Sequence, residues 1–241
     1  MGRDWSHIRG VLLDKDGTVL DYARTWVPIN REIALAAADG DRNLADTLLL
    51  AGGHDPKTDL VTPGSPLAAA GVAGIVKCFE SVLGAQTPPD LLATVKRLFA
   101  EGGGKHAVLI EGAAEVIAEL KALGLVVGLA TNDSEGGMQA SLARVGLRNA
   151  FDFLVAADSG YGEKPGPGMA QAFASAMGLK PDVLAAVGDA AHDLEMAAKA
   201  GFGLKVGVLS GTGRRVDLEP RADLILDSIR DLAARLGSGH Q

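Results

Sequence analysis

Short apolar segments alternate with helical patterns along much of this chain, and this alternation constrains the fold more than any other feature. Segments with apolar residues at helical spacing separate most of the strand-like ones, and three of them end at a glycine. Alternating strands and helices form a parallel sheet covered on both faces, so we expect a doubly wound, Rossmann-like α/β core. The expected strands are 8–13, 125–130, 153–156, 183–187, 204–209 and 223–226, and the helices that end at glycine are 111–124, 133–146 and 193–201.

The alternation is interrupted once, after the first expected strand. From Asp21 to about Lys105 the sequence contains helical patterns punctuated by prolines and glycines but no convincing strand. We therefore expect residues 22–105 to form a small all-helical cap domain, and residues 1–21 and 106–241 to form the α/β core. The expected cap helices are 29–40, 41–53, 65–84 and 88–104, and the segment EGGGKHAV, 101–108, is expected to be a flexible hinge back into the core.

Charge and cysteine content narrow the possible partners and surroundings. The 241-residue chain has a net charge of −7, which disfavours nucleic acid as its main partner. Cys78 is the only cysteine, so no intrachain disulfide is expected, and a reducing compartment fits. We find no apolar run of the ~20 residues that span a bilayer and no signal peptide, although Gly2 and Ser6 match a loose myristoylation pattern. We expect a cytoplasmic protein without membrane contact, and the sequence leaves its oligomeric state open.

The first expected strand runs directly into two carboxylates, in VLLDKDGTVLD, 11–21. Asp14 and Asp16 are one residue apart, and two negative charges this close are unfavourable unless a positive group lies between them. A metal ion would supply that charge. A helix–loop–helix calcium loop does not fit, because loop positions 6 and 12 are Val19 and Thr25 instead of glycine and an acid.

Three further polar stretches follow later strands, and the carboxyl ends of parallel strands meet at one edge of a sheet. Together the four stretches offer carboxylates, a hydroxyl, an amide and an ammonium group. Oxygen ligands suit Mg²⁺, and cationic or hydrogen-bonding groups suit phosphoryl oxygens. The candidate residues are Asp14, Asp16, Thr131, Asn132, Lys164, Asp189 and Asp193.

These four stretches, in this order, resemble the motifs of the haloacid dehalogenase superfamily of phosphatases. The resemblance extends from about residue 8 to residue 235, although the insert matches only in general type. The segments SGYGEKPGPGM (159–169), GDAAHDLEMAAKAG (188–201) and 207–232 resemble the phosphoglycolate phosphatase-like branch. The resemblance implies a Mg²⁺-dependent phosphatase that acts on a small phosphorylated metabolite, with phosphoglycolate as the first guess.

The resemblance also implies roles for the acidic residues. Asp14 would attack phosphorus and form an aspartyl-phosphate, and Asp16 would protonate the leaving oxygen and later activate water. The Mg²⁺ ligands would be the carboxylates of Asp14 and Asp189 and the backbone carbonyl of Asp16. Asp193 would bind the ion through water or orient its ligands.

The remaining implied roles concern phosphate binding and specificity. Thr131 and Lys164 would hold the phosphoryl oxygens, beside Asn132. Gly17 would allow the turn after the strand, where backbone N–H groups can face the phosphoryl group. Arg24 is a candidate for binding an anionic group of the substrate.

Several alternatives remain open at this point. Lys15 occupies a position that is usually apolar in the resembled family, and it could point to solvent, toward the cap or into the mouth of the site. His192, inside the fourth motif, fits a surface or helix-start residue better than an acid or base. A phosphomutase would use the same residues, and a non-catalytic binding module would have lost one of them. A signalling receiver domain shares the sheet and the phospho-accepting aspartate, but it is about half as long and lacks a helical insert.

Overall fold

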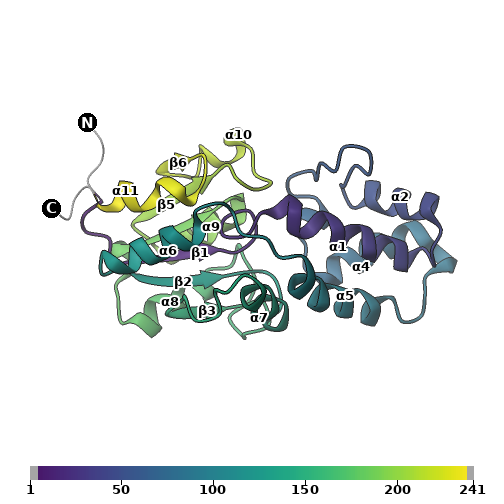
Figure 1. Ribbon diagram of the computed structural model, residues 1–241, viewed down its shortest axis with the longest axis horizontal. Coiled ribbons are helices and arrows are strands. Elements are labelled where there is room, and N and C mark those ends of the chain that lie inside the picture. Colours follow the sequence, from purple (N-terminus) through teal and green to yellow (C-terminus); the bar gives the residue numbers. More distant parts are fainter. Residues whose placement is uncertain (1–4, 238–241) are drawn as a thin grey trace.

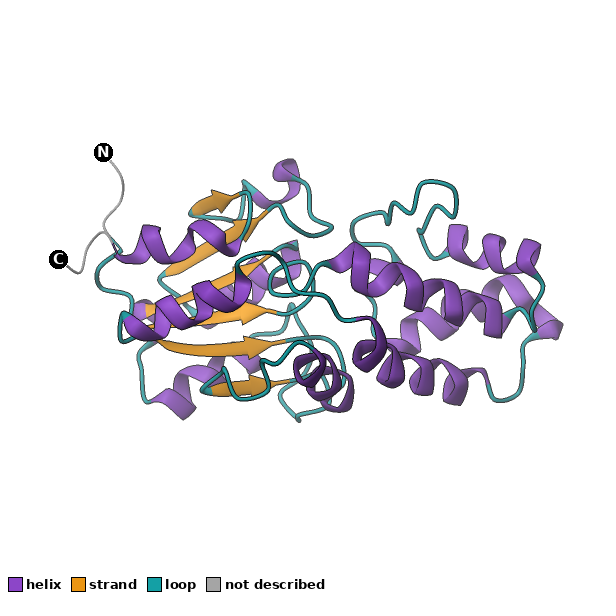
Figure 2. Cartoon of the chain, viewed as in Figure 1, coloured by secondary structure: helices purple, strands orange, loops and turns teal. Residues whose placement is uncertain are grey.

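The computed structural model describes residues 5–237 and contains a sheet region and a region made only of helices (Figures 1 and 2). Gly2, the position of the myristoylation pattern, lies outside these residues. The six strands are all parallel, in the order β3-β2-β1-β4-β5-β6, which confirms the expected doubly wound core. The strands are β1 (Gly10–Asp14), β2 (Val126–Ala130), β3 (Phe153–Val155), β4 (Leu184–Gly188), β5 (Leu204–Val208) and β6 (Leu224–Leu226).

Each face of the sheet packs on its own set of helices. Val11 and Leu13 of β1 point to one face and join a cluster with helices α6, α7 and α11, whereas Leu12 joins α8 and α9 on the other face. Successive residues of a strand point to opposite faces, so the apolar residues 11–13 of β1 can be buried on both faces. The core helices are α6 (Ala113–Ala122), α7 (Glu135–Arg144), α8 (Gly168–Met177), α9 (Ala191–Ala200), α10 (Arg215–Leu218) and α11 (Leu232–Gly237), with short 3₁₀ turns η2 (Pro181–Val183) and η3 (Ile229–Asp231).

The interval after β1 is helical, as expected, and we call it the helical insert. It has a hydrophobic cluster of its own, separate from the two clusters on the sheet. It consists of α1 (Tyr22–Ala37), α2 (Arg42–Ala51), α3 (Pro66–Ala69), α4 (Val72–Leu83), η1 (Gly84–Gln86) and α5 (Leu91–His106). The division into domains at 21/22 and 105/106 stays a prediction.

Two of the expected helix boundaries in the insert are wrong. Helix α1 begins at Tyr22, because the Asp21 side chain caps it by accepting from the backbone N–H of Arg24, and it continues through Pro28. Burial of Trp26 and Ile29 in the insert offsets the one backbone hydrogen bond that a proline removes. The single helix expected over 65–84 is interrupted at extended Ala70, which separates α3 from α4.

The expected hinge at 101–108 is also wrong, because the glycine run forms the last turns of α5. A Cβ on Gly102 would lie 2.7 Å from Ile29 of α1, and a Cβ on Gly103 would lie 2.3 Å from Ser141 Oγ of α7. The glycines therefore let α5 approach helices of both the insert and the core closely. None of the helices in residues 5–237 is sufficiently long and apolar to cross a membrane.

Candidate active site

The acidic residues of the first and fourth motifs meet at the carboxyl edge of the sheet. Asp14 is the last residue of β1, and Asp189 directly follows β4, the neighbouring strand. Asp193 is the third residue of α9 and accepts from the backbone N–H of Ala190 at 3.1 Å. Strands β1 to β3 are added toward one edge of the sheet and strands β4 to β6 toward the other, so the switch point lies between the neighbouring strands β1 and β4. Ligand-binding crevices form at such switch points.

Lys164 connects two of these carboxylates. Its Nζ lies 2.5 Å from Asp14 Oδ1 and 2.7 Å from Asp193 Oδ1, and its side chain is only 1% exposed. The loss of solvent opposes a charged ammonium, but the two carboxylates outweigh this and raise the pKa of Lys164. In this arrangement the ammonium contacts the carboxylates, and Lys164 is not among the residues that line the pocket.

The charges of this cluster fit a divalent cation. Carboxylate oxygens of Asp14, Asp189 and Asp193 all lie within 4.8 Å of one another, and when all three are ionised one lysine leaves two negative charges uncompensated. Burial raises the pKa of Asp14 well above its ordinary value and that of Asp189 to about 7, and neighbouring Asp193 adds to both effects. Burial also opposes the ionised form of Asp193, but Lys164 holds its pKa below the ordinary value. Hard oxygen ligands with a surplus of two negative charges suit Mg²⁺.

The loop after β5 fixes Asp189. Asp189 Oδ2 accepts from the backbone N–H of Thr212 at 2.7 Å. A Cβ on Gly211 would lie 2.0 Å from this Oδ2, and a Cβ on Gly213 would lie 1.8 Å from the Asp189 carbonyl oxygen. The two glycines of the turn 211–213 therefore allow its backbone to lie this close to the carboxylate and the carbonyl of Asp189, because a Cβ at either position would clash.

Gly17 occupies the tight turn after β1. Its φ is +84°, and a Cβ there would lie 2.6 Å from Asp189 Oδ2, so both conformation and space require glycine. Its N–H donates to the carbonyl of Leu20 at 2.7 Å. This N–H is therefore occupied within the turn, and phosphate binding by backbone N–H groups at Gly17 stays a prediction.

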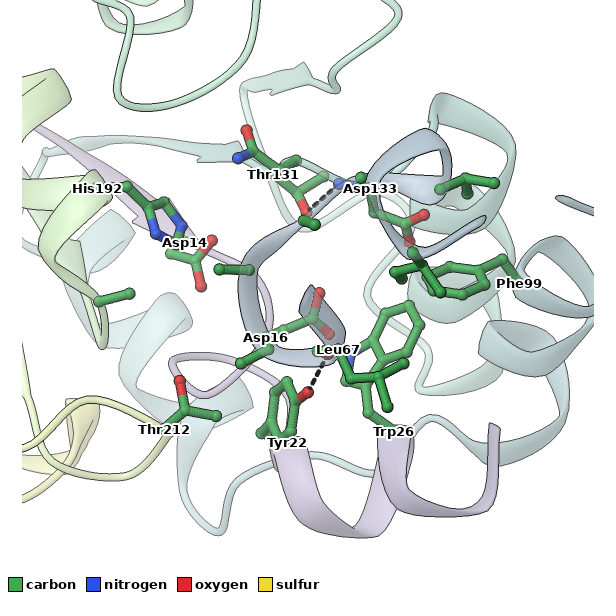
Figure 3. A pocket seen from close by; sticks show the side chains of 18 of the residues that line it. Asp14, Asp16, Tyr22, Trp26, Leu67, Phe99, Thr131, Asp133, His192 and Thr212 are labelled. Carbon is green, nitrogen blue, oxygen red and sulfur yellow. Dashed lines mark hydrogen bonds between the residues drawn. The ribbon is translucent and has the colours of Figure 1, made fainter. Parts of the chain in front are cut away.

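Thr131 and Asn132 follow β2 and both line the same pocket. Figure 3 shows Thr131 beside Asp133 in this pocket. The Thr131 hydroxyl accepts from the backbone N–H of Asp133 at 3.1 Å. The Asn132 amide accepts from the backbone N–H of Lys164 at 2.8 Å and donates to the Lys164 carbonyl at 3.2 Å. These two reciprocal hydrogen bonds fix the position of the Lys164 backbone relative to Asn132.

Lys15 points neither to solvent nor into the pocket. Of the three orientations that the sequence left open, the structure shows the one toward the helical insert. Its side chain is 0% exposed, with Nζ 2.9 Å from Asp16 Oδ2 and 3.0 Å from Asp133 Oδ2. The Nζ also lies 5.3 Å from the ring centroid of Trp26 in α1. Burial disfavours a charged lysine, but Asp16 and Asp133 more than offset this and raise its pKa.

One pocket joins the carboxylates to the helical insert. Its core side carries the acidic residues, Thr131 and His192, and its insert side carries aromatic and aliphatic residues from α1, α3, α4 and α5 (Figure 3). His192 lies near the start of α9, with Nε2 3.6 Å from Asp193 Oδ1. Arg24 is exposed and is not among the lining residues, so the structure does not bring it to the site.

With this geometry established, comparison with known proteins decides the family. Residues 8–201 match the model of the haloacid dehalogenase-like hydrolases. The chain belongs to this family. It is a phosphatase with the family's Rossmann-like fold.

Individual relatives span almost the whole chain. Proteins named phosphoglycolate phosphatase from Escherichia coli O157:H7 and Shigella boydii serotype 4 are each 31% identical, over 97% of this chain and 94% of theirs. A Haemophilus somnus crystal structure, described as a predicted phosphoglycolate phosphatase, aligns with a TM-score of 0.73 at 20% identity, over 95% of this chain and 97% of its own. A hydrolase of the same family from Deinococcus radiodurans, crystallised with phosphate and sodium, aligns with a TM-score of 0.70 at 20% identity, covering 98% and 97%.

Asp133, Thr212 and Trp26 are among the residues of this haloacid dehalogenase-like site that were missed from the sequence. Asp133 was read only as the start of a helix, and Thr212 and Trp26 were not assigned to the site. The pair formed by Asp133 and Lys15 had a signal, since a lysine at an apolar position needs a buried partner. The contacts of Thr212 and Trp26 depend on where distant segments pack, which local sequence does not specify.

Proposed function

We propose that this phosphatase hydrolyses phosphate monoesters of small metabolites with Mg²⁺, through an aspartyl-phosphate on Asp14. The observation that carries the proposal is the position of Asp14. Its buried carboxylate, at the end of β1, lies within 4.8 Å of Asp189 and Asp193 oxygens and faces a pocket large enough for a ligand. The relatives named phosphoglycolate phosphatase support the reaction class.

The two chemical steps assign distinct tasks to Asp14 and Asp16. An Asp14 oxygen attacks phosphorus, the bond from phosphorus to the leaving oxygen breaks, and Asp16 gives its proton to that oxygen. Asp16 then takes a proton from a water molecule, which attacks phosphorus and releases Asp14 and inorganic phosphate. Asp16 lines the pocket between the carboxylate cluster and the helical insert, on the side where a leaving group would lie (Figure 3).

Asp14, Asp189 and Asp193, with the backbone carbonyl of Asp16, would hold Mg²⁺. The bound ion would offset the repulsion between a phosphate dianion and the attacking carboxylate. Thr131 faces the pocket and would donate its hydroxyl hydrogen to a phosphoryl oxygen. Lys164 would supply the remaining positive charge once Mg²⁺ takes over part of its contact with the carboxylates.

The test measures inorganic phosphate release from a panel of small phosphate esters with Mg²⁺, with EDTA and with the Asp14→Asn protein. We expect release that depends on Mg²⁺ and falls by about 10³-fold or more in the variant, because the nucleophile is lost. Leu92→Ala, at an exposed site on α5, is a control that should retain the wild-type rate.

The same panel separates hydrolysis from transfer to a second hydroxyl. A phosphomutase would convert a hexose phosphate into its isomer without net phosphate release. Absence of release from every ester, with or without Mg²⁺, would contradict the proposed hydrolysis.

A further inference from the structure

The pocket wall opposite the carboxylates is built from uncharged side chains, and we call it the leaving-group wall. Four helices of the insert contribute to it, so the wall is the surface against which the non-phosphate part of a substrate would pack (Figure 3). Its principal residues are Tyr22, Trp26, Leu67, Val72, Ile75 and Phe99.

The wall is fixed by its own packing. The rings of Trp26 and Phe99 lie 4.9 Å apart at 48°, a tilted aromatic contact. The Tyr22 hydroxyl donates to the backbone carbonyl of Leu67 at 2.7 Å, which links α1 to α3 and occupies the polar end of the ring (Figure 3). The surface left to the pocket is therefore mainly apolar and held in one arrangement.

One polar group of the wall lacks a partner. Trp26 is 7% exposed, and its Nε1–H makes no hydrogen bond in the structure, although it is buried. A buried N–H without a partner costs roughly 1–3 kcal/mol. A ligand that packs on this wall, displaces the atoms that cover Nε1 and carries an acceptor oxygen would satisfy the indole N–H.

The charges beside the wall disfavour an anionic ligand. Asp16 and Asp133 both line the pocket next to it, and Lys15, which pairs with both, is itself 0% exposed. One ammonium between two ionised carboxylates leaves this group with a net negative charge, and when Asp16 is protonated for its role as acid the group is neutral. In neither state does it offer a net positive charge to an anionic ligand. Among the described residues that line the pocket, His192 is the one side chain able to become cationic, and it lies beside Asp193 on the core side.

We propose that the preferred substrate is the phosphate ester of an uncharged alcohol with an aromatic or branched apolar body and a hydrogen-bond acceptor. The inference rests on the proposed phosphatase function and specifies its substrate class. A carboxylate on the leaving group, as in phosphoglycolate, would approach Asp16 and Asp133, whose negative charge already takes up the neighbouring ammonium of Lys15. The acceptor of a neutral leaving group would instead bind Trp26 Nε1–H.

A matched pair of esters isolates the charge. 4-Carbamoylbenzyl phosphate and 4-carboxybenzyl phosphate share size and shape, but only the second carries a carboxylate. We expect kcat/KM with Mg²⁺ to be at least ~10-fold higher for the amide, and higher for the amide than for phosphoglycolate. Equal or faster hydrolysis of either carboxylate ester would overturn the inference.

Variants of the wall identify its residues. Phe99→Ala should lower kcat/KM for the amide ester by about tenfold and change that for phosphoglycolate by less than about threefold, because only the larger body contacts the ring. Trp26→Phe retains a ring but removes the N–H, so it should reduce the preference for the amide over unsubstituted benzyl phosphate.

Val72→Arg places a cation in the half-buried wall and should shift preference toward the carboxylate esters. Leu92→Ala, on the same helix as Phe99, is the control without effect.

Failure of the inference and failure of the proposed function give different results. If carboxylate esters are preferred and Asp14→Asn abolishes their hydrolysis, the phosphatase function stands and the wall assignment falls. If no ester is hydrolysed, calorimetric binding of the two corresponding benzylphosphonates, which cannot be hydrolysed, still tests the wall. Tighter binding of the amide phosphonate supports the inference, and equal or weaker binding overturns it.

Discussion

Lys15 carries a charge inside the molecule, where its ammonium is balanced by Asp16 and Asp133 on one side and by the Trp26 ring on the other. Breaking a buried ion pair by removing one partner leaves uncompensated charge, which typically costs about 3–5 kcal/mol. We expect Lys15→Met to lower the free energy of unfolding by about this amount, measured by urea denaturation.

A double variant separates this electrostatic cost from lost packing. Lys15→Met leaves the carboxylates of Asp16 and Asp133 without their cation. Adding Asp133→Asn removes one of these two charges, so the double variant should be more stable than Lys15→Met alone. Lys180→Met, at an exposed position, should change stability by less than about 0.5 kcal/mol. If the single and double variants were equally destabilised, the ion-pair account of Lys15 would be wrong.

At the scale of elements, close packing of α5 on α7 replaces the hinge expected from the glycine run. A Cβ on Gly103 would meet Ser141 Oγ at 2.3 Å and the Gly137 carbonyl at 3.1 Å, whereas a Cβ on Gly104 would meet only Ala140 Cβ at 3.6 Å. Alanine is favoured over glycine within a helix by roughly 0.5–1 kcal/mol. We therefore expect Gly104→Ala to stabilise the protein by about this amount and Gly103→Ala to destabilise it.

Thermal unfolding of the two variants measures this difference. Adding Ser141→Ala to Gly103→Ala should recover part of the lost stability, because the nearest clashing atom is removed. Equal stabilisation by both glycine substitutions would show that α5 does not pack on α7 this closely.

The sequence predicted the elements that follow local rules and missed those that depend on packing. The strands of the sheet were found because their apolar runs end in polar motifs, and α6, α7 and α9 because of their periodicity and glycine stops. The start of α1 was missed, since Pro28 usually marks a boundary, and α8 was hidden in a segment rich in glycine and proline. The glycines of α5 were misread because their reason lies on α1 and α7, far away in sequence.

The candidate site shows the same division. Asp14, Thr131, Lys164, Asp189 and Asp193 were named because parallel strands bring their ends to one edge. The sequence also suggested Arg24 for specificity, from its nearness to the first motif, but the start of α1 leaves this residue exposed. Nearness along the chain did not give nearness in the pocket.

At the scale of the whole molecule, Mg²⁺ binding should depend on pH through Asp189. Burial, with the charge of Asp193, raises its pKa in the folded protein to about 7, well above the ~3.9 of an unfolded chain. A raised carboxyl pKa favours folding below the unfolded value, and this contribution is lost as pH rises through about 7. Mg²⁺ would bind the ionised carboxylate and restore the lost stability.

We therefore expect Mg²⁺ to raise Tm more at about pH 8 than at about pH 5.5, where protons compete for the site. Differential scanning fluorimetry with and without Mg²⁺ at both pH values measures the effect. Asp189→Asn should abolish most of the shift. If Mg²⁺ raised Tm equally at both pH values, and equally in the wild type and Asp189→Asn, the acidic cluster would not be a cation site.

The helical insert and the sheet core meet over the pocket, so the phosphoryl group and the leaving group would contact different parts of the chain. The carboxylates come from the core, whereas the leaving-group wall comes from the insert. This separation allows the chemistry at Asp14 to be tested independently of substrate preference.

The most direct test of the central claim is to detect the phosphorylated enzyme. The protein would be mixed with its best ester and Mg²⁺, quenched in acid within milliseconds and digested for mass spectrometry. We predict a phosphoryl group on the peptide that contains Asp14, absent from Asp14→Asn. In Asp16→Asn, which loses both the acid and the base, this group should form more slowly and also be hydrolysed more slowly. Rapid phosphate release without any phosphorylated peptide, or with the group on another residue, would contradict the account.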